Sequence, residues 1–211
     1  MNFREWMQRC PLIAILRGVK PDEVEAIGFA LEEAGICIVE VPLNSPEPLK
    51  SIQTLARSFG DRMLVGAGTV TDPAMVAKIA DVGGRLIVTP HADLDVVRAA
   101  KSASLVAVPG FFNPTEAFAL LRAGADAIKL FPADVLGPPM LKAMRAVLPK
   151  EAMVLPVGGV GVEQIPVWAK AGAQGFGLGT SLYKPGDSAE MVKTNAEAFV
   201  AALKASGMEM N

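Results

Sequence analysis

The sequence predicts an α/β fold, a (β/α)8 TIM barrel in a single domain of residues 1–211 with a short N-terminal helix. Eight short apolar segments are spread along the chain, and each has the length of a strand rather than a helix. Amphipathic segments with helical spacing lie between them, several with a proline near the first turn. Three of these helical segments end in a glycine that leads directly into the next apolar run, at Gly35, Gly124 and Gly172.

The elements follow one another in a regular order along the chain. Residues 1–9 predict the short amphipathic helix. The eight expected strands are residues 12–16, 36–41, 63–66, 86–89, 105–108, 127–131, 153–157 and 175–179. The clearest expected helices between them are residues 21–34, 73–82, 114–123 and 163–171. Near-continuous apolar runs of this kind are typical of parallel strands that are covered on both faces.

Eight βα units in a chain of this length favour a closed barrel, and an open sheet of eight strands is the structural alternative. In a barrel the functional residues lie at the carboxyl ends of the strands. Polar or glycine-rich positions do gather there: Arg17, Glu40, Asn44, residues 66–69, 89–91 and 109–110, Lys129, and residues 158–159 and 179–181.

The composition excludes several classes of protein. Apolar residues make up 51% and charged residues 20% of the chain, which is typical of a globular protein. The apolar stretches are too short to span a membrane, and no secretory leader opens the sequence, so we expect a cytoplasmic protein. A net charge of −2 without a basic cluster argues against nucleic acid as a partner.

The histidine and cysteine content argues against metal and triad chemistry. His91 is the single histidine and the chain has no Cys-x-x-Cys, so we expect no metal site. A Ser-His-Asp triad would depend on His91 alone, and there is no Gly-x-Ser-x-Gly elbow. The two cysteines, Cys10 and Cys37, lie in apolar surroundings and are expected to be buried thiols.

Lys129 is the candidate nucleophile, because it interrupts an apolar strand. A lysine at such a position often extends its amine out to solvent between helices. A barrel strand has no solvated face, however, and burial lowers the pKa of an amine and supplies the neutral form that imine formation needs.

Glu40 interrupts another apolar strand in the same way. It could be the ion-pair partner of a buried lysine, or the carboxylate that moves protons beside an imine. Both readings place its side chain inside the barrel.

Arg17 and Thr69 are candidates for binding a substrate carboxylate, with a guanidinium fork and a hydroxyl. The alternatives are a surface arginine in a loop and a threonine that caps the helix before Pro73. Gly158, Gly159, Gly179 and Thr180 are candidates for binding phosphate, because backbone amides of glycine-rich loops can approach an anion and loops after strands seven and eight are its usual location in this fold.

Five motifs in this chain resemble those of the 2-keto-3-deoxy-6-phosphosugar-acid (KDPG/KHG) aldolase family over nearly the whole sequence. They are residues 39–45 (VEVPLNS), 66–70 (GAGTV), 88–90 (VTP), 129–132 (KLFP) and 157–160 (VGGV). The resemblance implies a class I aldolase with Lys129 as the Schiff-base lysine and Glu40 as acid and base. It also implies substrate contacts from Pro90, Phe131 and Val157.

The family cleaves a phosphorylated 2-keto-3-deoxy sugar acid into pyruvate and glyceraldehyde 3-phosphate, without a cofactor, and its members are typically homotrimers. Arg17, Asn44 and Val157 resemble the galactonate branch, whereas the gluconate branch typically has an arginine and a threonine at the last two positions. His91 and the pair Phe111 and Phe112 depart from that branch at the expected rim of the site.

The resemblance therefore predicts cleavage of 2-dehydro-3-deoxy-6-phosphogalactonate, with a gluconate-type or dual-specificity aldolase as the alternative. Two readings from other classes remain: a sugar-phosphate isomerase or decarboxylase that uses no imine, and a non-catalytic sensor of a phosphorylated ligand. Insensitivity to borohydride would favour the first, and binding without release of pyruvate the second.

Overall fold

The computed structural model describes residues 1–208, and in this part of the chain the apolar runs form parallel strands. The strands are β1 (Leu12–Ile15), β2 (Ile38–Pro42), β3 (Leu64–Gly68), β4 (Leu86–Val88), β5 (Val106–Val108), β6 (Gly110–Phe111), β7 (Ile128–Leu130), β8 (Val154–Pro156) and β9 (Phe176–Leu178). Each of the eight apolar runs thus contains a strand, and β6 is a strand that the apolar pattern did not predict.

The prediction of one closed eight-stranded barrel is wrong, because the strands form two separate sheets. One sheet has the order β5-β4-β3-β2-β1-β9 and the other β6-β7-β8. Between β8 and β9 the pairing is reduced to a single bridge, Val157 to Gly177. The fold is therefore a parallel α/β arrangement with a six-stranded and a three-stranded sheet.

Two prolines explain where the ladders break, because proline has no backbone N–H to donate. Pro109 separates β5 from β6, although its carbonyl still accepts a hydrogen bond from the Lys129 amide at 2.8 Å. At the other break, the Val154 carbonyl accepts from the Gln174 amide on the β9 side at 3.1 Å. Pro156, two residues further, faces the same side and has no donor to continue the ladder.

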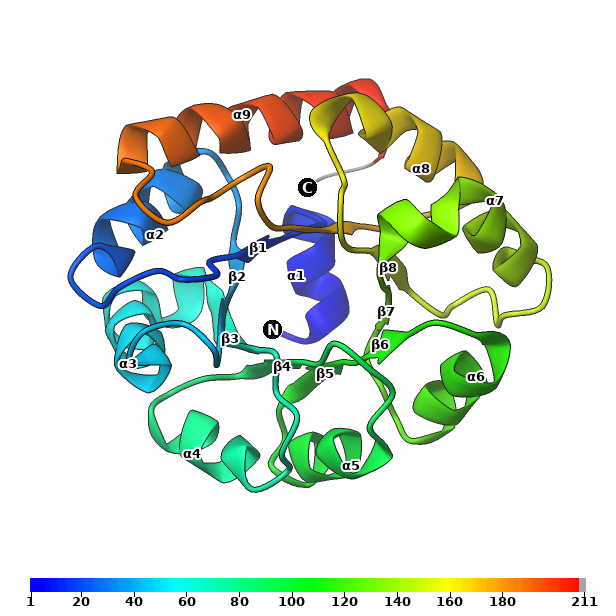
Figure 1. Cartoon of the computed structure of the whole chain (residues 1–211), viewed down its shortest axis with the longest axis horizontal. Coiled ribbons are helices and arrows are strands. Elements are labelled where there is room, and N and C mark those ends of the chain that lie inside the picture. Colours follow the sequence, from blue (N-terminus) through cyan, green and yellow to red (C-terminus); the bar gives the residue numbers. More distant parts are fainter. Residues whose placement is uncertain (209–211) are drawn as a thin grey trace.

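Helices α2 to α9 lie outside the strands and surround them (Figure 1). The helices are α1 (Phe3–Arg9), α2 (Val24–Glu33), α3 (Pro48–Phe59), α4 (Met75–Asp81), α5 (Leu94–Ser102), α6 (Pro114–Arg122), α7 (Ala133–Arg145), α8 (Ile165–Ala171) and α9 (Ala189–Ala205), with short 3-10 segments η1 (Gly60–Arg62) and η2 (Val162–Gln164). The glycines expected to end helices do so: Gly35, Gly124 and Gly172 have φ of 92°, 92° and 102°, a left-handed conformation that glycine adopts without strain.

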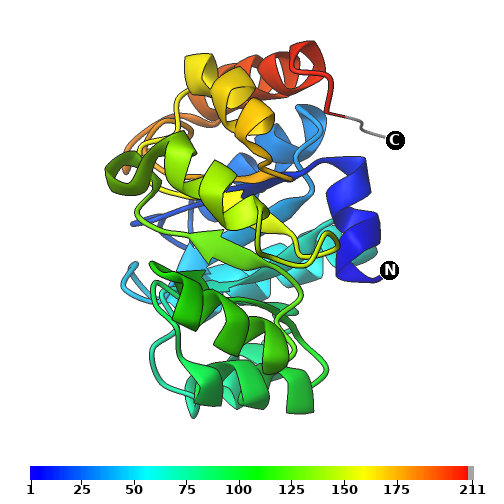
Figure 2. The same cartoon turned by 90° about the vertical axis from the view of Figure 1, so that its right-hand side faces the viewer.

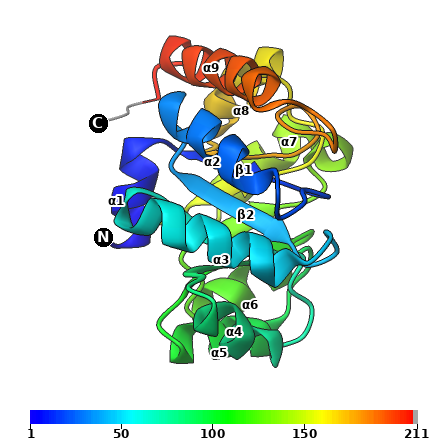
Figure 3. The ribbon, with the colours of Figure 1, turned by 90° about the vertical axis from the view of Figure 1, so that its left-hand side faces the viewer.

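The predicted N-terminal helix is present as α1 and differs from the others in its position. It is drawn at the centre of the ring in Figure 1, and Figures 2 and 3 show that it lies beyond one end of the strands, on the side of both termini. A capping box between Asn2 and Glu5 starts the helix, and Phe3, Trp6 and Met7 are buried. Because α1 covers the amino ends of the strands, the opposite end with the carboxyl ends is left for a site.

The buried side chains form one hydrophobic cluster between the strands and the helices. Helix α3 illustrates its contribution, since Ile52, Leu55 and Phe59 lie on one face and are buried. Each such side chain stabilises the fold by about 1.5–3 kcal/mol relative to an exposed one. Cys10 and Cys37 are buried free thiols, as expected. Within residues 1–208, no helix is both long enough and apolar enough to cross a membrane.

Candidate active site

One pocket at the carboxyl ends of the strands is lined by all the residues that the sequence predicts to be catalytic or to contact the substrate. Its volume is about 420 Å³. The predicted residues that line it are Arg17, Glu40, Thr69, Pro90, Lys129, Phe131, Val157, Gly158, Gly159, Gly179 and Thr180. These residues come from both sheets, so the pocket exists only when the two sheets are assembled.

Lys129 lies in the middle of β7 and its side chain is only 6% exposed. Its Nζ lies 4.5 Å from the centroid of the Phe131 ring. Burial lowers the pKa of Lys129 to about 8; Glu40 opposes this shift and Arg17 adds to it. A substantial fraction of the amine is therefore neutral near pH 8, as a nucleophile requires.

Glu40 lies in β2 and is 2% exposed. Burial raises the pKa of its carboxyl to about 7, while the positive charges of Lys129 and Arg17 hold it down. Its Oε2 is buried and has no hydrogen-bond partner among the described residues. An unsatisfied buried carboxylate oxygen is costly, and it marks a position where a ligand or substrate proton can be accepted.

The two groups interact without forming a close ion pair. None of the ion pairs within 4.0 Å in residues 1–208 involves Glu40 or Lys129. Burial brings the two pKa values close to neutrality, and the attraction between the two charges opposes both shifts without cancelling them. A carboxyl and an amine with pKa values of about 7 and 8 can exchange protons with a substrate at little cost.

Arg17 is held at the mouth of the pocket by two neighbours from adjacent strands. Its Nη1 donates to Asn44 Oδ1 at 2.5 Å and its Nη2 to Thr69 Oγ1 at 3.2 Å. The alternative reading of Thr69 as the cap of the next helix is wrong, because α4 begins after Ala74 without a side-chain cap. Arg17 is exposed, but it differs from the surface loop arginine of the alternative reading, because both of its terminal nitrogens donate hydrogen bonds within the protein.

The glycine loops form the other end of the pocket. Gly158 and Gly159 have φ of 102° and 67°, and a Cβ on Gly159 would lie 2.6 Å from Cβ of Asp134, so only glycine fits there. A Cβ on Gly179 would meet nothing within 4 Å, because this glycine faces the open pocket. In the described chain the amides of Gly159 and Thr180 donate no backbone hydrogen bond and are available to an anion.

Two polar residues of this pocket, Glu163 and Lys184, were missed by the sequence reasoning, whereas Ser181 belongs to the predicted strand-end segment 179–181. Ser181 donates from Oγ to the carbonyl of Val160 at 2.8 Å and so ties the two glycine loops together. Lys184 follows β9 by six residues, and its position after a glycine-rich strand end was the only sequence signal that could have suggested it.

His91 and the phenylalanine pair, which depart from the galactonate branch, lie outside the pocket lining. His91 Nε2 is 3.6 Å from Asp93 Oδ2, and its carbonyl accepts a hydrogen bond from the Thr89 hydroxyl. Phe111 is buried, whereas Phe112 is exposed. None of these three residues lines the pocket.

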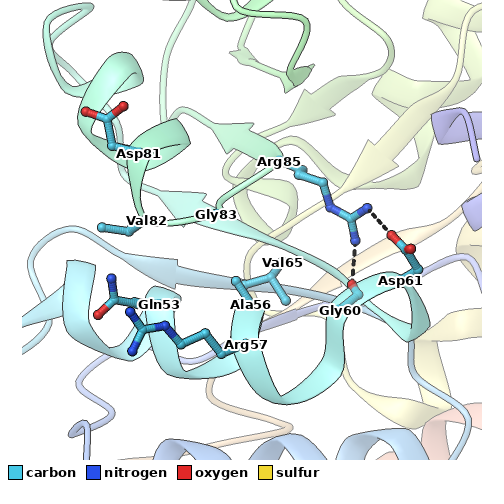
Figure 4. A pocket seen from close by; sticks show the side chains of 10 residues that line it. All are labelled: Gln53, Ala56, Arg57, Gly60, Asp61, Val65, Asp81, Val82, Gly83 and Arg85. Atoms are coloured by element: carbon cyan, nitrogen blue, oxygen red, sulfur yellow. Dashed lines mark hydrogen bonds and ion pairs between the residues drawn. The ribbon is translucent and has the colours of Figure 1, made fainter.

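A second pocket of about 440 Å³ lies near the amino ends of β3 and β4 (Figure 4). Arg85, one of the two arginines that line this pocket, donates hydrogen bonds to the Asp61 carboxylate at 3.0 Å and to the carbonyl of Gly60 at 2.7 Å. Figure 4 shows Arg57 and Gln53 at the opposite wall, on α3. This pocket has no buried ionisable group, so the chemistry belongs to the pocket around Lys129. Across the described residues, no group of three or more His, Cys, Asp or Glu is placed to hold a metal ion.

Parallel strands, helices outside them, and a strand-end pocket with a buried lysine and a buried carboxyl define an α/β enzyme with an amine available as nucleophile. The chain belongs to the KDPG and KHG aldolase family, whose model matches residues 3–200. The resemblance that the sequence motifs predicted is thereby confirmed.

Individual relatives agree with this assignment. The chain is 49% identical over 195 residues to a probable 2-dehydro-3-deoxy-6-phosphogalactonate aldolase of Rhizobium meliloti, covering 92% of each. It is 45% identical over 200 residues to the 2-dehydro-3-deoxy-6-phosphogalactonate aldolase of Escherichia coli, covering 95% of this chain and 98% of that one. A solved structure described as "Native KDPGal structure" matches with a TM-score of 0.93 and 45% identity, over 94% of this chain and 97% of that one.

Proposed function

We propose that this protein is a class I aldolase that cleaves 2-dehydro-3-deoxy-6-phosphogalactonate into pyruvate and D-glyceraldehyde 3-phosphate. The observation that carries the proposal is a buried lysine with a pKa of about 8 in one pocket with a buried carboxyl with a pKa of about 7. The relatives from Rhizobium meliloti and Escherichia coli are named for this activity and match the chain over more than nine-tenths of its length.

Imine formation is the first chemical step. The neutral amine of Lys129 attacks the C2 ketone, and the carbinolamine loses water to give an iminium ion. The iminium carbon is an electron sink next to C3. Burial of Lys129 supports this step, because it keeps the amine neutral at a pH where an exposed lysine would be protonated.

Carbon–carbon cleavage follows with Glu40 as the base. Glu40 takes the proton of the C4 hydroxyl, directly or through water, and the C3–C4 electron pair moves into the iminium to form an enamine. Glyceraldehyde 3-phosphate leaves as the aldehyde. Glu40 then returns the proton to C3, and water hydrolyses the imine to release pyruvate and free Lys129. The water lost on iminium formation is regained on hydrolysis, the C4 hydroxyl proton ends on C3, and no cofactor takes part.

The remaining pocket residues bind the two ends of the substrate. Arg17 and Thr69 hold the carboxylate, and Gly158, Gly159, Gly179 and Thr180 hold the phosphate through backbone amides and a hydroxyl. The side walls are supplied by Pro90, Phe131 and Val157. A pocket of about 420 Å³ is in the usual range for a small-molecule site.

Borohydride reduction in the presence of pyruvate tests the nucleophile. We expect a mass increase of one reduced pyruvate unit, confined to the peptide that contains Lys129. The control is Lys142→Ala, which removes an exposed lysine of α7 and should leave the adduct unchanged. An unmodified chain, an adduct on another lysine, or a Lys129→Ala protein with full activity would contradict the proposal.

The substrate epimer is tested by comparing kcat/KM for the galactonate-type and gluconate-type phosphosugar acids, which differ at C4. We expect the galactonate-type substrate to be cleaved faster. A preference for the other epimer, or equal rates, would replace this substrate with the gluconate-type or dual-specificity alternative. The homotrimer and the cytoplasmic location stay predictions.

A further inference from the structure

Gly68, the last residue of β3, lies directly against the carboxylate of Glu40. A Cβ built on Gly68 would lie 1.9 Å from Glu40 Oε2, 2.2 Å from Cδ and 2.3 Å from Oε1. Contacts below 3.0 Å are essentially never made by real Cβ atoms. The carboxylate of Glu40 therefore occupies the volume that the side chain of any other residue at position 68 would fill.

The backbone at Gly68 does not itself require glycine. Its φ is not among the positive values of this chain. Gly68 continues the β3 ladder in register with Pro42, and its carbonyl accepts a hydrogen bond from the Leu43 amide at 2.8 Å. Alanine can adopt this extended conformation, so the missing side chain must be explained by what lies beside it.

The neighbouring Gly66 shows the contrast. Gly66 pairs with Glu40 in the sheet, but a Cβ there would meet the backbone carbonyl of Leu86 at 2.0 Å. The packing of β3 against β4 accounts for Gly66. At Gly68 all three nearest atoms belong to the carboxylate of Glu40, which points to a role in the site instead.

Packing, and not a polar contact, holds the Glu40 carboxylate in position. Its Oε2 has no hydrogen-bond partner among the described residues, and no ion pair within 4.0 Å anchors it. The space above Gly68 thus determines where the carboxylate lies relative to Lys129.

We propose that Gly68 is a positioning residue that leaves room for the Glu40 carboxylate and so sets its distance from the imine formed on Lys129. The inference rests on the proposed aldolase function and assigns Gly68 no contact with the substrate. It predicts that filling this space displaces the base and leaves the nucleophile in place, because Lys129 is on β7 in the other sheet.

The first test is Gly68→Ala, assayed for cleavage and for borohydride trapping with pyruvate. We expect kcat to fall about 100-fold, the effect of a misplacement of roughly 1 Å at a reacting group. Trapping at Lys129 should continue, with KM changed far less than kcat. A kcat within twofold of the unaltered protein would overturn the proposal.

The second test compares Gly68→Ala in two backgrounds, because a residue that acts through Glu40 has no effect when that side chain is absent. Gly68→Ala is combined with Glu40→Ala, and residual turnover and thermal unfolding are measured for both single variants and the double variant. We expect Gly68→Ala to lower both quantities when Glu40 is present and neither when it is Ala. An equal loss in both backgrounds would show a merely structural role and overturn the inference.

Thermal unfolding also tests the proposal if Gly68→Ala alone does not fold. In that case the double variant should fold, because the Glu40 carboxylate that clashes with the new side chain has been removed. A double variant that stays unfolded contradicts the inference. Failure of the aldolase proposal is recognised separately, because the unaltered protein would then give no pyruvate adduct at Lys129.

Discussion

At the scale of single residues, the site depends on two ionisable groups whose burial moves their pKa values towards each other. Desolvation raises the pKa of Glu40 to about 7 and lowers that of Lys129 to about 8. Burying both groups costs stability, and no close ion pair among residues 1–208 recovers it. The cost is instead consistent with a site in which an amine must be neutral and a carboxyl must both accept and return a proton.

Glu40→Gln gives a signed pH prediction. The charge of Glu40 raises the pKa of Lys129, so its removal should lower that pKa below about 8 and move the acid limb of imine trapping to lower pH. Cleavage should slow by about 100-fold or more, since a general acid–base group is lost. Cyanoborohydride trapping rates with pyruvate from pH 6 to 9 measure the first effect.

Glu163→Gln is the control for that experiment, because Glu163 is an exposed carboxyl that lines the same pocket and is not among the groups that shift the pKa of Lys129. The acid limb of imine trapping should lie at the same pH in Glu163→Gln as in the unaltered protein. A limb that moves to higher pH in Glu40→Gln would show that Glu40 does not act on Lys129 through its charge.

At the scale of elements, neighbouring strands cooperate to orient one guanidinium. Strands β1, β2 and β3 are adjacent in the sheet, so the residues just after their carboxyl ends lie side by side. Arg17 follows β1, Asn44 follows β2 and Thr69 follows β3, and the first donates to the other two. Parallel order thereby brings three distant sequence positions together, in the arrangement that we propose binds the substrate carboxylate.

Asn44→Ala tests this arrangement. Loss of the bond from Arg17 Nη1 should weaken carboxylate binding by about 1 kcal/mol, or roughly fivefold in KM, with kcat little changed. Steady-state kinetics give the two constants separately. Gln53→Ala, in the pocket of Figure 4, is the matched control and should change neither. A loss confined to kcat would mean that Asn44 acts on the chemical step instead.

At the scale of the whole molecule, the two ends of the strands have separate tasks. Helix α1 covers the amino ends with buried apolar side chains, and the pocket occupies the carboxyl ends. Stability and chemistry can therefore be altered independently.

Trp6→Ala should make this division visible. Trp6 is buried in α1, and truncation of a buried tryptophan costs about 3–5 kcal/mol of unfolding free energy. Denaturant unfolding measures the loss, whereas pyruvate trapping of the folded variant should be unchanged. Val167→Ala, at an exposed position of α8, should shift stability by no more than about 0.5 kcal/mol. A Trp6→Ala protein that folds normally but traps no pyruvate would contradict the separation.

Much of the site was predictable because charges inside apolar strands are conspicuous. Glu40 and Lys129 each interrupt a run that otherwise reads as buried, and strand ends are where parallel folds place function. Lys184 and Glu163 were not predictable in this way, since a polar residue outside the strands looks the same whether it faces a pocket or bulk solvent. Gly68 was recognised only as part of the glycine-rich segment 66–69, because its contact with Glu40 depends on the pairing of β2 with β3.

The sequence by itself determined where the strands lie, where helices end, and which two ionisable groups would be buried, because these depend on local periodicity and on residues near in the chain. Tertiary structure alone decided that the strands form two sheets, since the effect of Pro109 and Pro156 depends on which strand lies opposite each missing N–H. It also decided that Asn44 and Thr69 share Arg17, and that Gly68 makes room for Glu40. Contacts between distant segments are set by the three-dimensional arrangement of the strands, and no local pattern encodes them.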